Sequence, residues 1–171
     1  DWITNIIYEG QYVEGLTIHS PDVFLVSGGG NDLVGNHRMA VMVSKTDTEE
    51  PKYTELPDSI SQEERTAIMS AQKYITKEFH AFIWVMKIQY TILFKQIYAP
   101  NSKHKNIISI TQGYAYPYPK KGNNFSLRYP LQPIVNSFLD SGKWLFQPLM
   151  MRGILDEQLQ RSIVTTFIYE F

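Results

Sequence analysis

The chain has 171 residues, of which 43% are hydrophobic and 13% aromatic, so it holds enough apolar material for one compact domain with a core. Sixteen basic and 17 acidic residues leave a formal net charge of −1, and this balance argues against nucleic-acid binding. The absence of cysteine excludes disulfides, thiolate-bound zinc and a thiol nucleophile. No apolar run is long enough to span a bilayer. We therefore expect a single domain over residues 1–171 without a membrane span.

Two largely apolar runs predict the strands of this domain. Residues 22–27 are rich in β-branched and aromatic side chains and are followed by three glycines, and residues 107–111 form a second run of the same kind. Runs without polar alternation are typical of strands that are covered on both faces, as in a parallel sheet. We expect the two runs to form neighbouring, buried, parallel strands.

A helical pattern lies between the two runs, from about Ser61 to Tyr98. Ser61 and Glu64 have the spacing of a capping box, and apolar residues then recur at helical intervals. The order strand, helix, strand is the unit of a parallel sheet. Residues 113–148 are rich in proline and predict a long loop with short helical turns, and a second helical pattern begins at residue 156.

The segment that begins at Ser27 and continues Gly-Gly-Gly-Asn-Asp carries the chemistry of the sequence. A phosphate-binding loop is disfavoured, because Asn36 and His37 stand where that loop needs Lys and then Ser or Thr. The dinucleotide fingerprint is disfavoured as well, because its third glycine is missing. A phosphate ligand therefore has little support here.

Two other interpretations of the same segment remain open. In the first, it is a glycine-rich turn in which Asp32 caps the following helix. In the second, it is an oxyanion site at the carboxyl end of a buried strand, where ligands of doubly wound sheets bind. The amide of Asn31 would then donate to the negative oxygen of a tetrahedral intermediate.

Residues 22–32 resemble the third conserved block of the SGNH (GDSL-like) hydrolases, a buried strand followed by Gly-x-Asn-Asp. Residues 107–119 resemble a His-Gly-Tyr-Asp-Tyr-Pro segment found in one branch of that family. Residues 142–148 resemble the Gly-Pro-Trp-Leu stretch of the same branch. The likeness spans roughly residues 20–155, and the first of these blocks is its most specific part.

The resemblance implies a three-layer α/β/α fold around a parallel sheet of the flavodoxin-like type, here without its first strands and its last. It implies hydrolysis of a small-molecule ester or an acylated substrate, with no cofactor and no metal. Asn31 would be a donor of the oxyanion hole. Contacts with the substrate are expected from residues at the ends of the two strands, namely Gly29, Gly30, Asp32, Gly113 and Tyr114.

The chain departs from the family at the positions that carry the reaction. No Gly-Asp-Ser block precedes Asn31, and no Asp-x-x-His block follows it. Ser141 stands between Asp and Gly, but it lies in the proline-rich region without a strand before it, and this predicts a turn. Gln112 and Ala115 replace the His and the Asp of the family branch. We expect the nucleophile and the base to lie outside this chain, and the chain alone to be inactive.

The four histidines offer no replacement for the missing base. None of them follows an Asp by three residues, and no two of them form a zinc-binding His-x-x-x-His pair. Two further classes of function therefore stay open beside the hydrolase. The first is a non-catalytic binding or interaction module of the SGNH type, and the second, which is less favoured, is a glycine-rich nucleotide binder.

Overall fold

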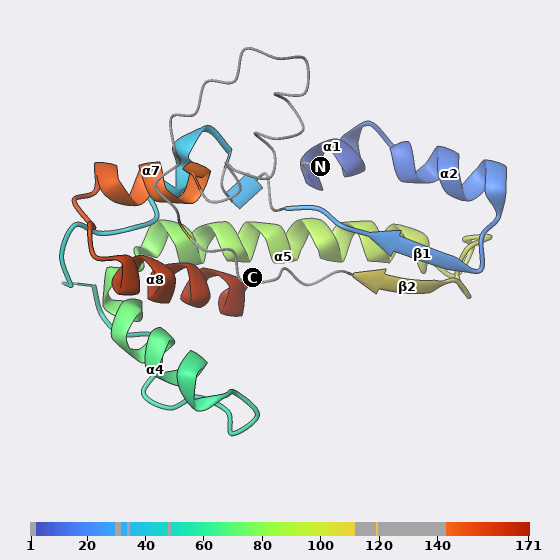
Figure 1. The fold of residues 1–171 in the computed structure, drawn as a ribbon. Helices are drawn as coiled ribbons and strands as arrows, with labels where there is room; N and C mark the ends of the chain where they lie inside the picture. The colour runs from blue at the N-terminus through green and yellow to red at the C-terminus, as the bar shows by residue number, and fades with distance from the viewer. Residues whose placement is uncertain (1–2, 30–31, 34, 48, 112–118, 120–142) are drawn as a thin grey trace, which may run out of the picture. The chain divides into compact units, whose positions relative to one another are not determined.

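The computed structural model describes residues 3–29, 32–33, 35–47, 49–111, 119 and 143–171 (Figure 1). The chain divides into two compact units. Unit 1 consists of residues 1–35 and 80–114, and unit 2 consists of residues 36–79 and 115–171. Each unit is described by itself below.

Unit 1 contains the strand pair that the sequence predicts. β1 (Val23–Val26) pairs in parallel with β2 (Ile108–Thr111), and Val23 lies opposite Ile108. Two short helices, α1 (Ile3–Tyr8) and α2 (Gln11–His19), precede β1. The long helix α5 (Lys77–Ile97), which belongs to unit 1 from residue 80 onward, connects to β2. The prediction of two neighbouring parallel strands is confirmed.

The prediction that both strands are buried is wrong for one face of the pair. Residues that lie opposite one another in parallel strands project to the same face of a sheet. Val23 and Leu25 are 43% and 73% exposed, and their partners Ile108 and Ile110 are 61% and 48% exposed. On the other face Val26 is buried. Only one face of the pair is therefore covered within the described chain.

The expected three-layer α/β/α fold is contradicted. The described residues form a sheet of two strands, and most of the remaining ordered chain is helical. A third layer would have to cover the face that carries Leu25 and Ile110, and no described element covers it. The physical reason is that an apolar run promotes burial without specifying how many other strands it pairs with.

The helix predicted for residues 61–98 is broken into pieces. It forms α4 (Gln62–Ala71), a short 3₁₀ helix η2 (Gln72–Tyr74) and α5. Ser61 and Glu64 form the predicted capping box. The break arises because Ile75 is extended and pairs with Val43 in an antiparallel bridge. Tertiary backbone hydrogen bonds have overridden the helical periodicity at this point.

Unit 2 is built on the packing of helices. Its further elements are the 3₁₀ helix η1 (Gly35–Ala40), whose first residue belongs to unit 1, and the helices α7 (Lys143–Met151) and α8 (Glu157–Glu170). α8 packs on α4, and the rings of Phe79 and Phe167 stack with centroids 4.2 Å apart in the core. Asp156 caps α8 by accepting from the Leu159 N–H, so the helix predicted from residue 156 is confirmed. The last residues of the predicted proline-rich loop belong instead to α7.

Two further features concern the described part of the chain as a whole. No helix within it has the length and apolar character needed to cross a membrane. No group of three or more histidine and carboxylate side chains within it is arranged to hold a metal ion.

Candidate functional site

The turn after β1 is packed closely against α1. A Cβ atom on Gly28 would lie 3.0 Å from Cδ1 of Ile6 and 3.3 Å from Cδ1 of Ile3, so the missing side chain is what lets the helix approach. Both isoleucines are buried. Gly29 has a φ of 94°, a conformation in which a side chain would be strained. Gly28 and Gly29 therefore have structural reasons to be glycine.

Asp32 ties the same turn to the start of α1. Its side chain is buried, and its Oδ2 atom accepts a hydrogen bond of 2.9 Å from the Ile3 backbone N–H. Ile3 is the first residue of α1, where the N–H groups have no partner within the helix and attract negative charge. One of the sequence-based interpretations has Asp32 capping the helix that follows it. The contact observed here is with the helix that precedes β1.

A third contact holds the turn from the side of α5. The Tyr90 hydroxyl donates a hydrogen bond of 2.9 Å to the Gly28 carbonyl. Just after the last residue of α5, the Tyr98 hydroxyl donates a hydrogen bond of 3.1 Å to the carbonyl of Ile107, the residue before β2. α5 is thus joined to the carboxyl end of one strand and to the amino end of the other.

The predicted site residues are only partly within the described chain. Gly29 and Asp32 lie in the turn, close to the carboxyl end of β1. Asn31 and Gly30, which stand between them in the sequence, lie outside the described residues, as do Gly113 and Tyr114. Three other residues considered in the sequence also lie outside them, namely Gln112, Ala115 and Ser141.

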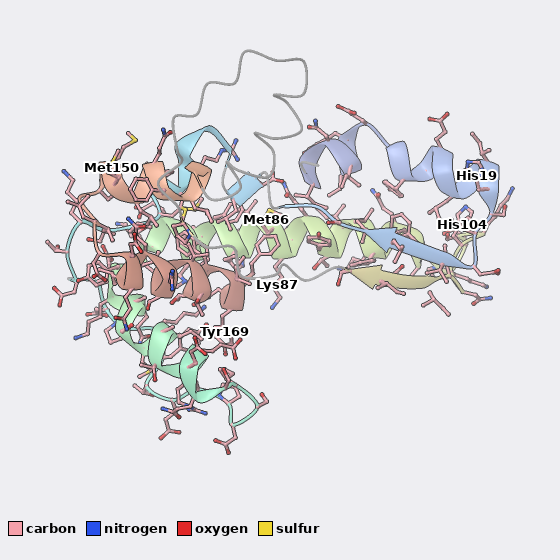
Figure 2. The ribbon with its side chains drawn as sticks, viewed as in Figure 1. His19, Met86, Lys87, His104, Met150 and Tyr169 are labelled. Atoms are coloured by element: carbon pink, nitrogen blue, oxygen red, sulfur yellow. The ribbon has the colours of Figure 1, made fainter. Side chains whose placement is uncertain are left out.

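Two of the histidines lie at the opposite end of the strand pair. His19 ends α2 just before β1, and His104 lies in the turn that leads into β2 (Figure 2). The carboxyl ends of parallel strands share one edge of the sheet, so His19 and His104 are at the other edge from Gly28. Neither histidine is placed to act as a base beside the Gly28–Asp32 turn.

Tyr90 is the residue of this region that sequence reasoning missed. Its position in a long apolar helix suggests a core aromatic and gives no sign of a hydrogen bond to a strand end. A tyrosine among phenylalanines and isoleucines is a weak signal for a hydrogen bond, because a phenol that is buried usually needs a partner for its hydroxyl. Only the fold identifies that partner as Gly28.

Three contacts hold the described residues of the chain segment that follows β1. The Gly28 packing and the Tyr90 hydroxyl hold the chain three residues before position 31, and the Asp32 carboxylate holds it one residue after. A turn of this kind holds polar groups at the edge of a parallel pair without being itself reactive. No family model, no curated protein and no solved structure matches this chain.

Proposed function

We propose that this chain is part of an SGNH-type serine hydrolase that acts on an ester bond in a small or acylated substrate. Asn31 donates a hydrogen bond to the oxyanion. The nucleophilic serine and the His/Asp base lie outside this chain. The enzyme needs no cofactor for this chemistry, because acyl transfer from an ester requires only a nucleophile, a base and oxyanion donors.

The observation that carries the proposal is the set of contacts that hold Gly28 and Asp32, the residues described on the two sides of Asn31. An oxyanion donor works because it is held in place before the reaction and pays little reorganisation when charge develops. Gly28 and Asp32 are both buried and hydrogen-bonded, on the two sides of Asn31. Such supporting contacts are what a precisely placed donor needs.

The chemistry assigns different tasks to the residues of this turn. The serine attacks the ester carbonyl while the histidine accepts its proton, and the carbonyl oxygen becomes negative. Asn31 donates its amide N–H to that oxygen. Gly29 and Gly30 leave room for the substrate, and Asp32 positions the turn through α1. Gly113 and Tyr114, which follow β2 in the sequence, are the further residues proposed to contact the substrate.

The proposal is tested on the gene product that carries this chain. A fluorophosphonate probe forms a covalent bond to an activated serine with loss of fluoride. We expect labelling of a serine in a Gly-Asp-Ser block outside this chain, together with hydrolysis of p-nitrophenyl acetate. Ser27→Ala and Ser141→Ala serve as controls and should leave both readouts unchanged. Labelling that disappears with either control would place the nucleophile in this chain and contradict the proposal.

The second candidate is a non-catalytic binding or interaction module. It is favoured by one observation, which is that neither a Gly-Asp-Ser nor an Asp-x-x-His block occurs in the chain. The same experiment separates the two candidates. A gene product that contains neither block and neither reacts with the probe nor hydrolyses the ester is such a module.

A further inference from the structure

An apolar row runs along the outward side of α5 in unit 1. Trp84, Ile88 and Ile92 follow one another at intervals of four residues, so they lie on one side of the helix. Their side chains are 63%, 37% and 42% exposed, although each is large and apolar. Val85 lies beside this row and is also exposed. A contiguous patch of exposed apolar side chains is typical of a surface that binds a protein, a ligand or a membrane.

Lysines border the row and lead into a groove. Lys87 and Lys95 are exposed and lie eight residues apart on α5, about 12 Å along the helix axis. Figure 2 marks Lys87 on this helix. Both line a groove of 630 Å³. The same groove is lined by the aromatic residues Tyr90, Phe94 and Tyr98. The apolar row and the groove thus make one continuous surface, here called the α5 surface.

The aromatic rings of the groove are turned toward one another. Tyr90 and Phe94 have ring centroids 6.1 Å apart at an interplanar angle of 26°, and Phe94 and Tyr98 have centroids 6.3 Å apart at 27°. A flat ring inserted between two others needs about 7 Å, which is two contacts of roughly 3.5 Å. A nucleic-acid base cannot enter these gaps. Ring edges and aliphatic side chains suit flexible hydrocarbon chains better.

Beyond its first turn, the charged side chains of α5 are lysines. No aspartate or glutamate occurs between Glu78 and Asp140, whereas the chain as a whole has 17 acidic residues. Within the described part of that interval, every charged side chain is a lysine: Lys87, Lys95, Lys103 and Lys105. An anionic partner at α5 would be attracted by these lysines.

We propose that the α5 surface docks on an anionic lipid surface. Trp84, Ile88 and Ile92 enter the headgroup region, and the aliphatic stems of Lys87 and Lys95 follow them while the ammonium groups reach lipid phosphates. Tryptophan is well suited to this depth, because its ring is apolar and its N–H is polar. The contact is peripheral, since α5, although 21 residues long, is not apolar enough to cross a bilayer. This inference is independent of the proposed ester hydrolysis.

The test measures binding of the whole chain to vesicles. Trp2→Phe with Trp144→Phe leaves Trp84 as the only tryptophan, since the chain has three. Phosphatidylglycerol vesicles should bind this protein and shift the Trp84 emission to the blue, and phosphatidylcholine vesicles should not. Lys87→Gln with Lys95→Gln should lower the partition coefficient by about 25-fold, since each surface lysine contributes roughly a fivefold effect. Trp84→Ser, followed by sedimentation, should lower it by roughly tenfold or more.

Matched variants separate the α5 surface from general charge and stickiness. Lys45→Gln with Lys73→Gln removes two exposed lysines of unit 2, and Ile18→Ser removes an apolar side chain of α2 that is 65% exposed. Neither change should alter the partition. Equal binding to both vesicle types, or equal loss with the control variants, would overturn the proposal. It would also be overturned if the protein bound soluble polyglutamate, as an acidic protein surface, and ignored the vesicles.

Discussion

Asp32 has a structural partner in an element far from it in sequence. Its carboxylate accepts from the N–H of Ile3, 29 residues earlier, and its side chain is buried. A buried carboxylate that lost its charge would leave the first N–H of α1 with a weaker acceptor. The hydrogen bond of a backbone donor to a charged group is stronger than one to a neutral group. Asp32 therefore positions the turn that precedes it.

We predict that Asp32→Asn lowers the free energy of unfolding by about 1–3 kcal/mol, the usual effect of weakening a buried hydrogen bond to a charged group. Asp22→Asn is the control, because Asp22 is exposed at the other end of β1. Urea unfolding monitored by circular dichroism measures both. Equal stability of the two variants would show that the Ile3 contact contributes nothing.

We predict that replacing glycine by alanine changes the free energy of unfolding in opposite directions at Gly28 and at Gly15. A Cβ on Gly28 would press on Ile3 and Ile6, both buried, whereas a Cβ on Gly15 meets nothing within 4 Å. Gly28→Ala should cost about 1 kcal/mol through overpacking. Gly15→Ala, within α2, should stabilise by about 0.5–1 kcal/mol because alanine favours helix. The difference in sign is read from the urea midpoints. Two shifts in the same direction would contradict the packing at Gly28.

At the scale of elements, features that depend on neighbouring residues were predicted better than features that depend on residues distant in the sequence. The capping box at Ser61 and the start of the last helix at Asp156 depend on neighbouring residues, and both are formed. The parallel pairing of residues 22–27 with residues 107–111 was predicted as well, because two apolar runs flank a helix. The break at Ile75 was not, since it depends on a bridge to Val43, which is distant in sequence.

The sequence was enough to single out residues of the candidate site, but it did not predict which residues they would contact. The glycines and Asp32 were singled out by their order after a strand. That Asp32 would contact Ile3, and that Tyr90 would reach Gly28, depends on how α1 and α5 pack. Packing of this kind is set by the whole unit and leaves no pattern in a short segment.

The end of α8 is held by an ion pair with an aromatic neighbour. Lys52 pairs with Glu170, whose side chain is only 2% exposed, and the Lys52 ammonium also lies 5.1 Å from the centre of the Tyr53 ring. Burial lowers the pKa of Lys52, but the hydrogen bonds to Glu170 and Tyr53 and the charges of these two groups together outweigh it, and the net pKa is raised. Because the pKa is raised in the folded state, the contribution of the pair to stability is fully present below the unfolded-state pKa of lysine and is lost as the pH rises through the higher folded-state pKa.

We predict that Glu170→Gln lowers the free energy of unfolding by about 1 kcal/mol at pH 8, since Lys52 is partly exposed to solvent. The difference from the unmodified protein should shrink above pH 10.5, the ordinary pKa of lysine, as Lys52 loses its proton. Asp58→Asn is the control, because the carboxylate of Asp58 is fully exposed and lies 3.7 Å from Arg65. It should change little at either pH. A difference for Glu170→Gln that stays constant from pH 8 to pH 11 would contradict the ion pair.

At the scale of the whole molecule, the missing blocks determine what this chain can do alone. An oxyanion donor stabilises negative charge but does not attack a carbonyl. We predict that the isolated chain hydrolyses p-nitrophenyl acetate no faster than the same chain after heat denaturation. The measurement is the release of nitrophenolate at equal protein concentration. Turnover that is abolished by Ser141→Ala or Ser27→Ala would identify a nucleophile within the chain.

The most direct measurement is the turnover of the Asn31→Ala variant of the whole gene product. Loss of one oxyanion donor lowers kcat by about 10²–10³. The value of KM should change little, because the interaction forms mainly in the transition state. Asn106→Ala is the matched control, since Asn106 is exposed at the amino end of β2 and should leave kcat unchanged. An Asn31→Ala protein that keeps its kcat, or loses it only by unfolding, would contradict the proposed role of Asn31.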